Sequence, residues 1–307
     1  MSQTIWTSIQ ALIVCSVIIT LSGYALLRNR GLTLIRSLSR DKSKITVRLL
    51  QRIEVAPRVY RLRFGLASDR HILGLPIGCH ISLGATLISP ISSDERYVSR
   101  QYTPVSTDFD DKGYFDLVVK VYRKNEHPNF PAGGMMSQYL ETLPIGSMID
   151  VKGPGGRIEY LEGGRFKIGS EKFCVKHVGM IAGGTGVTPM FQITKHVLNT
   201  RRGKDSLKLS LLYGNQHPGE ILLREELERF TLDAPNQFTL GLTVDRLEND
   251  EKWSGHLGFV SEAMIKESMP RPSSDVLMLL CGPPPMVRSV TSMLQTMGYR
   301  ADRIYAF

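Results

Sequence analysis

The spacing of apolar and polar residues divides the chain into three stretches. Residues 5–27 form one long apolar run without a charged side chain. Between about residues 44 and 156, short alternating segments recur, such as Val59–Phe64 (VYRLRF) and Phe115–Tyr122 (FDLVVKVY), with Gly and Pro between them. A period of two residues is typical of half-buried strands. Many short strands separated by turn residues predict an antiparallel barrel or sandwich.

From about residue 177, short apolar strands alternate with helical segments. We expect strands at 178–182, 206–213, 238–244 and 276–281, and helices at 190–198, 220–230, 261–268 and 285–297. Alternation of this kind predicts a parallel sheet with helices on both faces.

The apolar run at the start of the chain has the length of a membrane span. As a helix, Ile5–Leu27 would be about 35 Å long at ~1.5 Å per residue, enough to cross a hydrocarbon core roughly 30 Å thick. Basic residues follow it between positions 28 and 44, and none precedes it. The positive-inside tendency then leaves the C-terminal part in the cytosol. A cleaved signal peptide is the alternative, but the run is long and lacks a positive n-region.

Composition narrows the class of protein further. The chain of 307 residues has a formal net charge of +9, which permits an acidic partner, a nucleic acid or an anionic membrane surface. Much of the excess flanks the apolar run, which favours the membrane. Four cysteines without a C-x-x-C pair argue against a zinc site or a disulfide framework. We therefore expect an anchor with a basic linker (1–44), a β domain (45–156) and an α/β domain (157–307).

Two segments of the β domain carry candidate chemistry. In Arg100–Ser106 (RQYTPVS), Arg100 offers a planar fork of donors suited to pyrophosphate, and Tyr102 offers a flat ring face. The pair Gly133–Gly134 opens a short helix, whose free N–H groups form an anion site. Taken singly, these are ordinary strand, turn and loop residues. The polar stretch 88–96 before the first segment is expected to be a hairpin loop.

The α/β domain carries three further candidates. The loop Gly183–Pro189 (GGTGVTP) follows a strand and precedes a helix, as phosphate-binding loops do. Asp245 ends the third strand, where a carboxylate can accept from a ribose 2′-hydroxyl and repel a 2′-phosphate. Cys281–Met286 (CGPPPM) closes the last strand with a rigid turn. A buried cysteine can also be simply a small hydrophobe.

In this order, the segments resemble the NADH–cytochrome b5 reductases, a family within the ferredoxin reductase-like FAD and pyridine-nucleotide enzymes. The likeness runs from about Thr46 to the terminal Phe307. The segments that carry it are RQYTPVS (100–106), VVKVY (118–122), HPNFPAGGMMSQYL (127–140), GMIAGGTGVTPM (179–190) and CGPPPM (281–286).

The resemblance implies a set of cofactor contacts. It implies that FAD is held by Arg100, Gln101, Tyr102, Thr103, Ser106, Val118, Lys120, Gly134, Met136 and Ser137, with Thr188 nearby. It places NADH against Gly183, Gly184, Asp245, Cys281 and Pro283. Thr103, beside the reactive ring, Lys120, between the cofactors, and Cys281 are the candidate catalytic residues. Gln101 stands where proline is common, and Arg123 where an aromatic residue is familiar.

The resemblance also implies the activity. We expect a membrane-anchored flavoprotein: an N-terminal membrane helix, an antiparallel β-barrel FAD domain and a parallel-sheet NAD-binding domain. It would pass electrons from NADH through FAD to cytochrome b5 or another small haem protein. A monomer on the endoplasmic reticulum or the mitochondrial outer membrane is expected, with no metal and no nucleic acid. The alternatives are an enzyme of the same build with another acceptor, such as a quinone, and a tethered scaffold protein without turnover.

Overall fold

The computed structural model describes residues 34–39, 41, 44–88, 94–125, 131–200, 206–248 and 252–307. Residues 36–307 belong to one unit. The expected membrane helix at Ile5–Leu27 lies outside the described residues. Within the described ranges, no helix combines the length and the apolar character that crossing a membrane requires.

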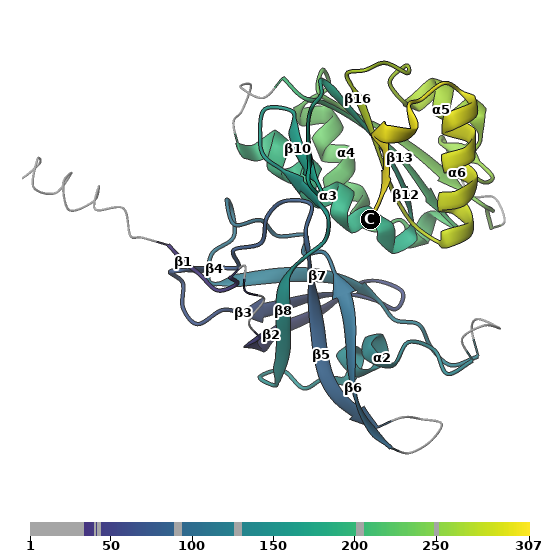
Figure 1. Ribbon diagram of the computed structural model, residues 1–307. Helices are drawn as coiled ribbons and strands as arrows, with labels where there is room; N and C mark the ends of the chain where they lie inside the picture. The colour runs from purple at the N-terminus through teal and green to yellow at the C-terminus, as the bar shows by residue number, and fades with distance from the viewer. Residues whose placement is uncertain are drawn as a thin grey trace, which may run out of the picture. The chain divides into compact units, whose positions relative to one another are not determined.

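The first half of this unit is built on a six-stranded antiparallel sheet in the order β6-β5-β8-β2-β3-β7 (Figure 1). Its strands are β2 (Lys44–Ala56), β3 (Val59–Gly65), β5 (His80–Ile88), β6 (Glu95–Tyr102), β7 (Tyr114–Lys120) and β8 (Met148–Gly155). The alternation predicted for β3 is confirmed: Leu62 and Phe64 are buried, whereas Arg61 and Arg63 are partly exposed.

The edges of this sheet show how far the expected barrel closes. Strands β6 and β7 stand at opposite ends of the order, so the described residues form an open sheet rather than a fully hydrogen-bonded barrel. The strands on either side of the hairpin loop predicted at 88–96 pair with each other up to Ile88 of β5 and Glu95 of β6, so the loop is shorter than expected; its residues 89–93 lie outside the described residues. Helix α2 (Met135–Thr142) packs Met136 and Leu140 into the core of this half. The two-residue strands β1 (Ile35–Arg36) and β4 (His71–Ile72) lie outside the large sheet.

A small antiparallel sheet follows the first half. It consists of β9 (Ile158–Tyr160), β10 (Arg165–Ile168) and β11 (Glu171–Cys174), in the order β11-β10-β9. These strands had no counterpart among the expected elements. The predicted domain limits at 44/45 and 156/157 stay predictions.

The second half is a parallel six-stranded sheet in the order β15-β14-β13-β12-β16-β17. Its strands are β12 (His177–Gly183), β13 (Lys208–Asn215), β14 (Phe238–Val244), β15 (His256–Leu257), β16 (Val276–Cys281) and β17 (Ile304–Ala306). The helices are α3 (Val187–Thr200), α4 (Arg224–Asp233), α5 (Glu262–Ser268) and α6 (Pro284–Thr296), with 3₁₀ turns η1 (Gly184–Gly186), η2 (Pro218–Glu220) and η3 (Ala301–Arg303).

The helices cover both faces of this sheet, as the alternation predicted (Figure 1). On β12, Met180 packs with residues of α3 and α4, while its neighbour Ile181 packs with residues of α5 and α6. Successive side chains of a strand point to opposite faces. A strand buried on both faces therefore reads as a continuous apolar run.

One buried apolar cluster spans the two halves, in addition to the core that each half has of its own. Val59, Val105 and Val118 of the first half belong to the same buried cluster as Val187 and Phe191 of α3. Because this packing joins the β sheet to the helix that follows the glycine loop, it sets the candidate site between the halves.

Candidate functional site

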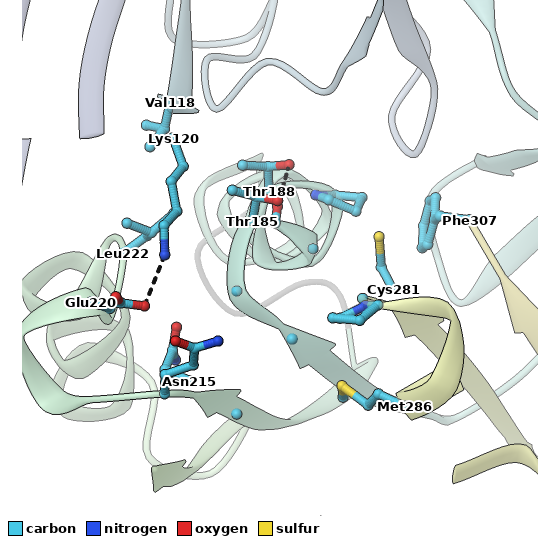
Figure 2. Close-up of a pocket in the computed structure, with 18 of the residues that line it drawn as sticks. Val118, Lys120, Thr185, Thr188, Asn215, Glu220, Leu222, Cys281, Met286 and Phe307 are labelled. Atoms are coloured by element: carbon cyan, nitrogen blue, oxygen red, sulfur yellow. Dashed lines mark hydrogen bonds and ion pairs between the residues drawn. The ribbon is translucent and has the colours of Figure 1, made fainter. Parts of the chain in front are cut away.

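A cavity of about 1110 Å³ opens between the two halves, and residues of both line it (Figure 2). The first half contributes the carboxyl ends of β6 and β7 and the start of α2. The second half contributes the carboxyl edge of the parallel sheet, where such folds place ligands. The predicted site residues that line the cavity are Arg100, Gln101, Tyr102, Thr103, Val118, Lys120, Gly134, Met136, Ser137, Gly183, Gly184, Thr188, Asp245, Cys281 and Pro283.

Ser106 is the predicted site residue that the structure places elsewhere. It is buried, and its Oγ accepts a hydrogen bond from the Asp116 N–H of β7 at 2.9 Å. Its hydroxyl ties the segment after Thr103 to the sheet. The motif therefore contains a residue that supports the cavity wall from behind.

Two anion-binding features lie on the side of the cavity formed by the first half. The exposed guanidinium of Arg100 donates to the Ser99 carbonyl at 2.8 Å and forms no ion pair with any described carboxylate. Helix α2 begins after Gly134, so the first N–H groups of the helix lack acceptors within it. The Ser137 hydroxyl is already engaged with the Gly134 carbonyl (3.0 Å) and the Tyr122 N–H (3.2 Å). Backbone N–H groups and Arg100 therefore fit a diphosphate such as that of FAD.

Close packing explains the glycine loop of the second half. A Cβ on Gly186 would come within 2.3 Å of the Cys281 carbonyl oxygen, so only glycine lets the loop approach β16. Gly184 has a φ of +53°, in the left-handed region that glycine enters without strain. The Tyr213 hydroxyl donates to the Gly184 carbonyl (3.0 Å) and accepts from the Leu222 N–H (3.3 Å), which holds the loop in place.

Asn215 is a polar cavity residue that the sequence reasoning missed. Its side chain is only 6% exposed and points into the cavity (Figure 2). Burial raises the pKa of Tyr213, and the nearby Asn215 amide opposes that shift. Yet its Nδ2 forms no hydrogen bond of ordinary geometry within the described residues. A buried donor without a partner is costly, so this amide fits an oxygen-rich ligand such as a dinucleotide. Its position at the end of β13 was the signal available, since the same edge argument selected Asp245.

An ion pair crosses the cavity from one half to the other. Lys120 Nζ of β7 lies 2.8 Å from Glu220 Oε2 of η2, with 24% and 32% of the two side chains exposed (Figure 2). Glu220 was not among the predicted residues. Asp245 lies just after β14, in an exposed position. The pKa of its carboxyl group is nevertheless raised, mainly because part of the group is shielded from solvent. Glu220 adds to this rise, and Arg246 opposes it.

Burial shifts the pKa values of two further cavity groups, Cys281 and His80, towards their neutral forms. Burial raises the pKa of the Cys281 thiol to about 11, which favours the neutral thiol over the thiolate. Burial lowers the pKa of His80, another cavity residue missing from the prediction. In their neutral forms, these two groups contribute hydrogen bonding and shape to the cavity wall.

Comparisons with known proteins agree with this geometry. Residues 46–160 match the family described as oxidoreductase FAD-binding domain, and residues 180–292 match the oxidoreductase NAD-binding domain. NADH-cytochrome b5 reductase 2 of Mus musculus is 42% identical over 278 residues, covering 88% of this chain and 97% of that protein. NADH-cytochrome b5 reductase 3 of Mus musculus is 44% identical, covering 86% of each chain.

A solved structure supports the same assignment. The cytochrome b5 reductase domain of Ulva prolifera nitrate reductase has a TM-score of 0.82 and 36% identity, over 89% of this chain and all of that domain. Together with the two binding halves around one cavity, these relatives show that the chain belongs to the NADH-cytochrome b5 reductase family.

Proposed function

We propose that this protein passes electrons from NADH through FAD to cytochrome b5. The observation that carries the proposal is the cavity of about 1110 Å³ that both halves line. It has room for a flavin and a nicotinamide side by side, and the flavin-side and nucleotide-side motifs meet in it. The family relationship supports the same donor and cofactor.

Each side of the cavity has its own task. Arg100 and the first N–H groups of α2 hold the FAD diphosphate, while Tyr102, Thr103 and Val118 flank its ring system. Gly183, Gly184 and Pro283 receive the dinucleotide, and Asp245 accepts from its ribose. When bound, FAD takes a hydride from NADH and releases electrons singly, which joins a two-electron donor to a one-electron haem acceptor.

The apolar walls also protect the reaction. Val118 and Leu222 lie on either side of Lys120 in the cavity (Figure 2). Their side chains keep water away from the space between the two cofactors, and this strengthens the electrostatic interactions there. Thr188, whose hydroxyl donates to the Thr185 carbonyl at 3.2 Å, borders the same space.

We further propose that Ile5–Leu27 anchors a monomeric protein in a membrane, with the catalytic part in the cytosol. The charge-free run and its basic flank support this proposal. The endoplasmic reticulum and the mitochondrial outer membrane are the two candidate locations.

Acceptor assays with the purified full-length protein test the function. The preparation should be yellow, NADH should bleach it without air, and oxidised cytochrome b5 should then be reduced, as read from its haem absorbance. A colourless protein would point to the scaffold alternative. A bleached protein that reduces a quinone but not cytochrome b5 would assign it another acceptor.

A further inference from the structure

The charged side chains that line the cavity differ in whether an ion pair already engages them. Among the described residues that line the cavity, the Lys and Arg side chains are Arg100 and Lys120, and the carboxylates are Glu220 and Asp245. Arg100 lies on the FAD side and has no carboxylate partner. The cation left for a second dinucleotide is therefore Lys120, and Glu220 already holds it at 2.8 Å.

The position of Glu220 is set by its backbone. It ends the 3₁₀ turn Pro218–Glu220, whose cap is His217: the Gly219 N–H donates to His217 Nδ1 at 3.1 Å, and the Glu220 N–H donates to the His217 carbonyl at 3.0 Å. Two residues further on, the Leu222 N–H donates to the Tyr213 hydroxyl. The carboxylate thus projects into the cavity from an anchored turn.

A dinucleotide carries a diphosphate, and this side of the cavity meets it with little positive charge. Lys120 is neutralised by Glu220, and Asp245 adds a further carboxylate to the same wall. To stabilise the bound phosphates, the Lys120 ammonium group must separate from the Glu220 carboxylate. Because the carboxylate left behind is half-buried, its separation from the cation opposes binding.

We propose that Glu220 sets the affinity for the dinucleotide by competing with its diphosphate for Lys120. This inference rests on the proposed function. The carboxylate weakens NADH and NAD⁺ alike, and in this way it favours release of the oxidised product between turnovers. Glu220 thus determines affinity rather than specificity, and it acts through Lys120.

The first test compares Glu220→Gln with the wild-type holoprotein by calorimetric titration with NAD⁺. Loss of a competing half-buried ion pair should lower the dissociation constant about three- to tenfold. The KM for NADH should fall in parallel, and inhibition by NAD⁺ should become stronger. FAD content per protein should not change.

The chain offers a matched control. Arg61 and Glu226 join the same two halves at 2.6 Å, and neither lines the cavity. If Glu220 acted only by holding the halves together, Glu226→Gln would change NAD⁺ affinity in the same way. We expect the affinity of Glu226→Gln to stay within about twofold of wild type, the scale of an exposed ion pair.

A double variant isolates the route through Lys120. Lys120→Met should weaken NAD⁺ binding. The double variant with Glu220→Gln should bind NAD⁺ no more tightly than Lys120→Met alone. An unchanged or weaker affinity in Glu220→Gln, or a gain that persists without Lys120, would overturn the inference. Failure of the proposed function looks different: the wild type itself would lack FAD or resist bleaching by NADH.

Discussion

Arg100 lies near the carboxyl end of β6 with an exposed guanidinium that no described carboxylate neutralises. We predict that Arg100→Ala loses FAD rather than merely slowing turnover. Removing the charge-assisted bond forfeits ~1.5–3 kcal/mol, or roughly ten- to a hundredfold in affinity. Flavin content after gel filtration measures this, and Arg100→Lys should lie between the two because it keeps the charge without the fork. Arg48→Ala, on an exposed position of β2, is the control; full occupancy in Arg100→Ala would leave the diphosphate to α2 alone.

Asp245 follows β14 at the sheet edge, and its N–H donates to the Asn215 carbonyl at 3.0 Å. A 2′-phosphate ~4 Å from its carboxylate would meet about 4 kcal/mol of repulsion per charge pair at an effective dielectric near 20. Exposure of the carboxylate to solvent reduces this repulsion, yet a remaining penalty of ~1.4 kcal/mol would already weaken the binding of NADPH tenfold. Asp245→Thr should therefore raise kcat/KM for NADPH and lower that for NADH. If Asp245→Thr kept the wild-type preference between NADH and NADPH, the loop after Tyr213 rather than Asp245 would select the nucleotide.

Asp108 gives the fold a residue-scale pH dependence. Burial raises its pKa to about 6, against hydrogen bonds from the Gly74 and Leu73 N–H groups. Its pKa in the unfolded chain is about 3.9, so the folded state binds the proton more tightly and this group's contribution to stability falls as pH rises from about 4 to 6. Relative to wild type, Asp108→Asn should gain about 1–3 kcal/mol between pH 4 and pH 7. Urea denaturation at both values measures it, and parallel behaviour of the two proteins would contradict the assignment.

At the scale of elements, a buried amide helps to hold helix α3 to the first half. Gln192 is 1% exposed; its Oε1 accepts from the Gly78 N–H at 2.8 Å, and its Nε2 donates to the Pro104 carbonyl at 3.2 Å. Because Pro104 lies just after β6, this side chain links the segment that follows β6 to helix α3, which follows the glycine loop.

We predict that Gln192→Leu destabilises the fold, since it leaves two buried backbone groups without partners at ~1–3 kcal/mol each. At roughly 2–4 °C per kcal/mol, the melting temperature should fall by about 4 °C or more. The exposed Gln51→Leu on β2 is the control. Equal melting temperatures for the two variants would mean that neither bond matters.

At the scale of the whole molecule, the proposed anchor should be separable from catalysis. Leu38 is buried at 3% in the core of the first half, and its N–H donates to the Leu73 carbonyl at 2.9 Å. A protein that starts at Leu34 keeps this contact and should be soluble, hold FAD and reduce ferricyanide with NADH. One that starts at Ser43 should be equally soluble but less stable by about 2–5 kcal/mol, as expected for a lost core leucine. Recovery of the Leu34 form in the membrane pellet would refute the anchor.

The periodicity of the sequence was enough to predict most elements of the second half, whereas only two strands of the first half were located by residue. The strands at 238–244 and 276–281 match β14 and β16 residue for residue, because turn residues bound each apolar run. Helix boundaries were less accurate. The helix expected at 220–230 begins at Arg224, because Pro218–Glu220 forms a separate 3₁₀ turn. The sequence motifs also predicted which kinds of chemical group line the cavity, because the residue types of each motif can be read directly from the sequence.

Only the tertiary structure decided which side chains meet. Lys120 and Glu220 are 100 residues apart in the chain, and Gln192 and Gly78 are 114 apart. No local pattern encodes such pairs, because they follow from how the two halves pack against each other. For the same reason, the sequence could not show that Ser106 bonds to the Asp116 N–H without lining the cavity, or that Asn215 faces the cavity. The residue types set the chemistry that the chain can perform, and long-range packing sets which groups perform it.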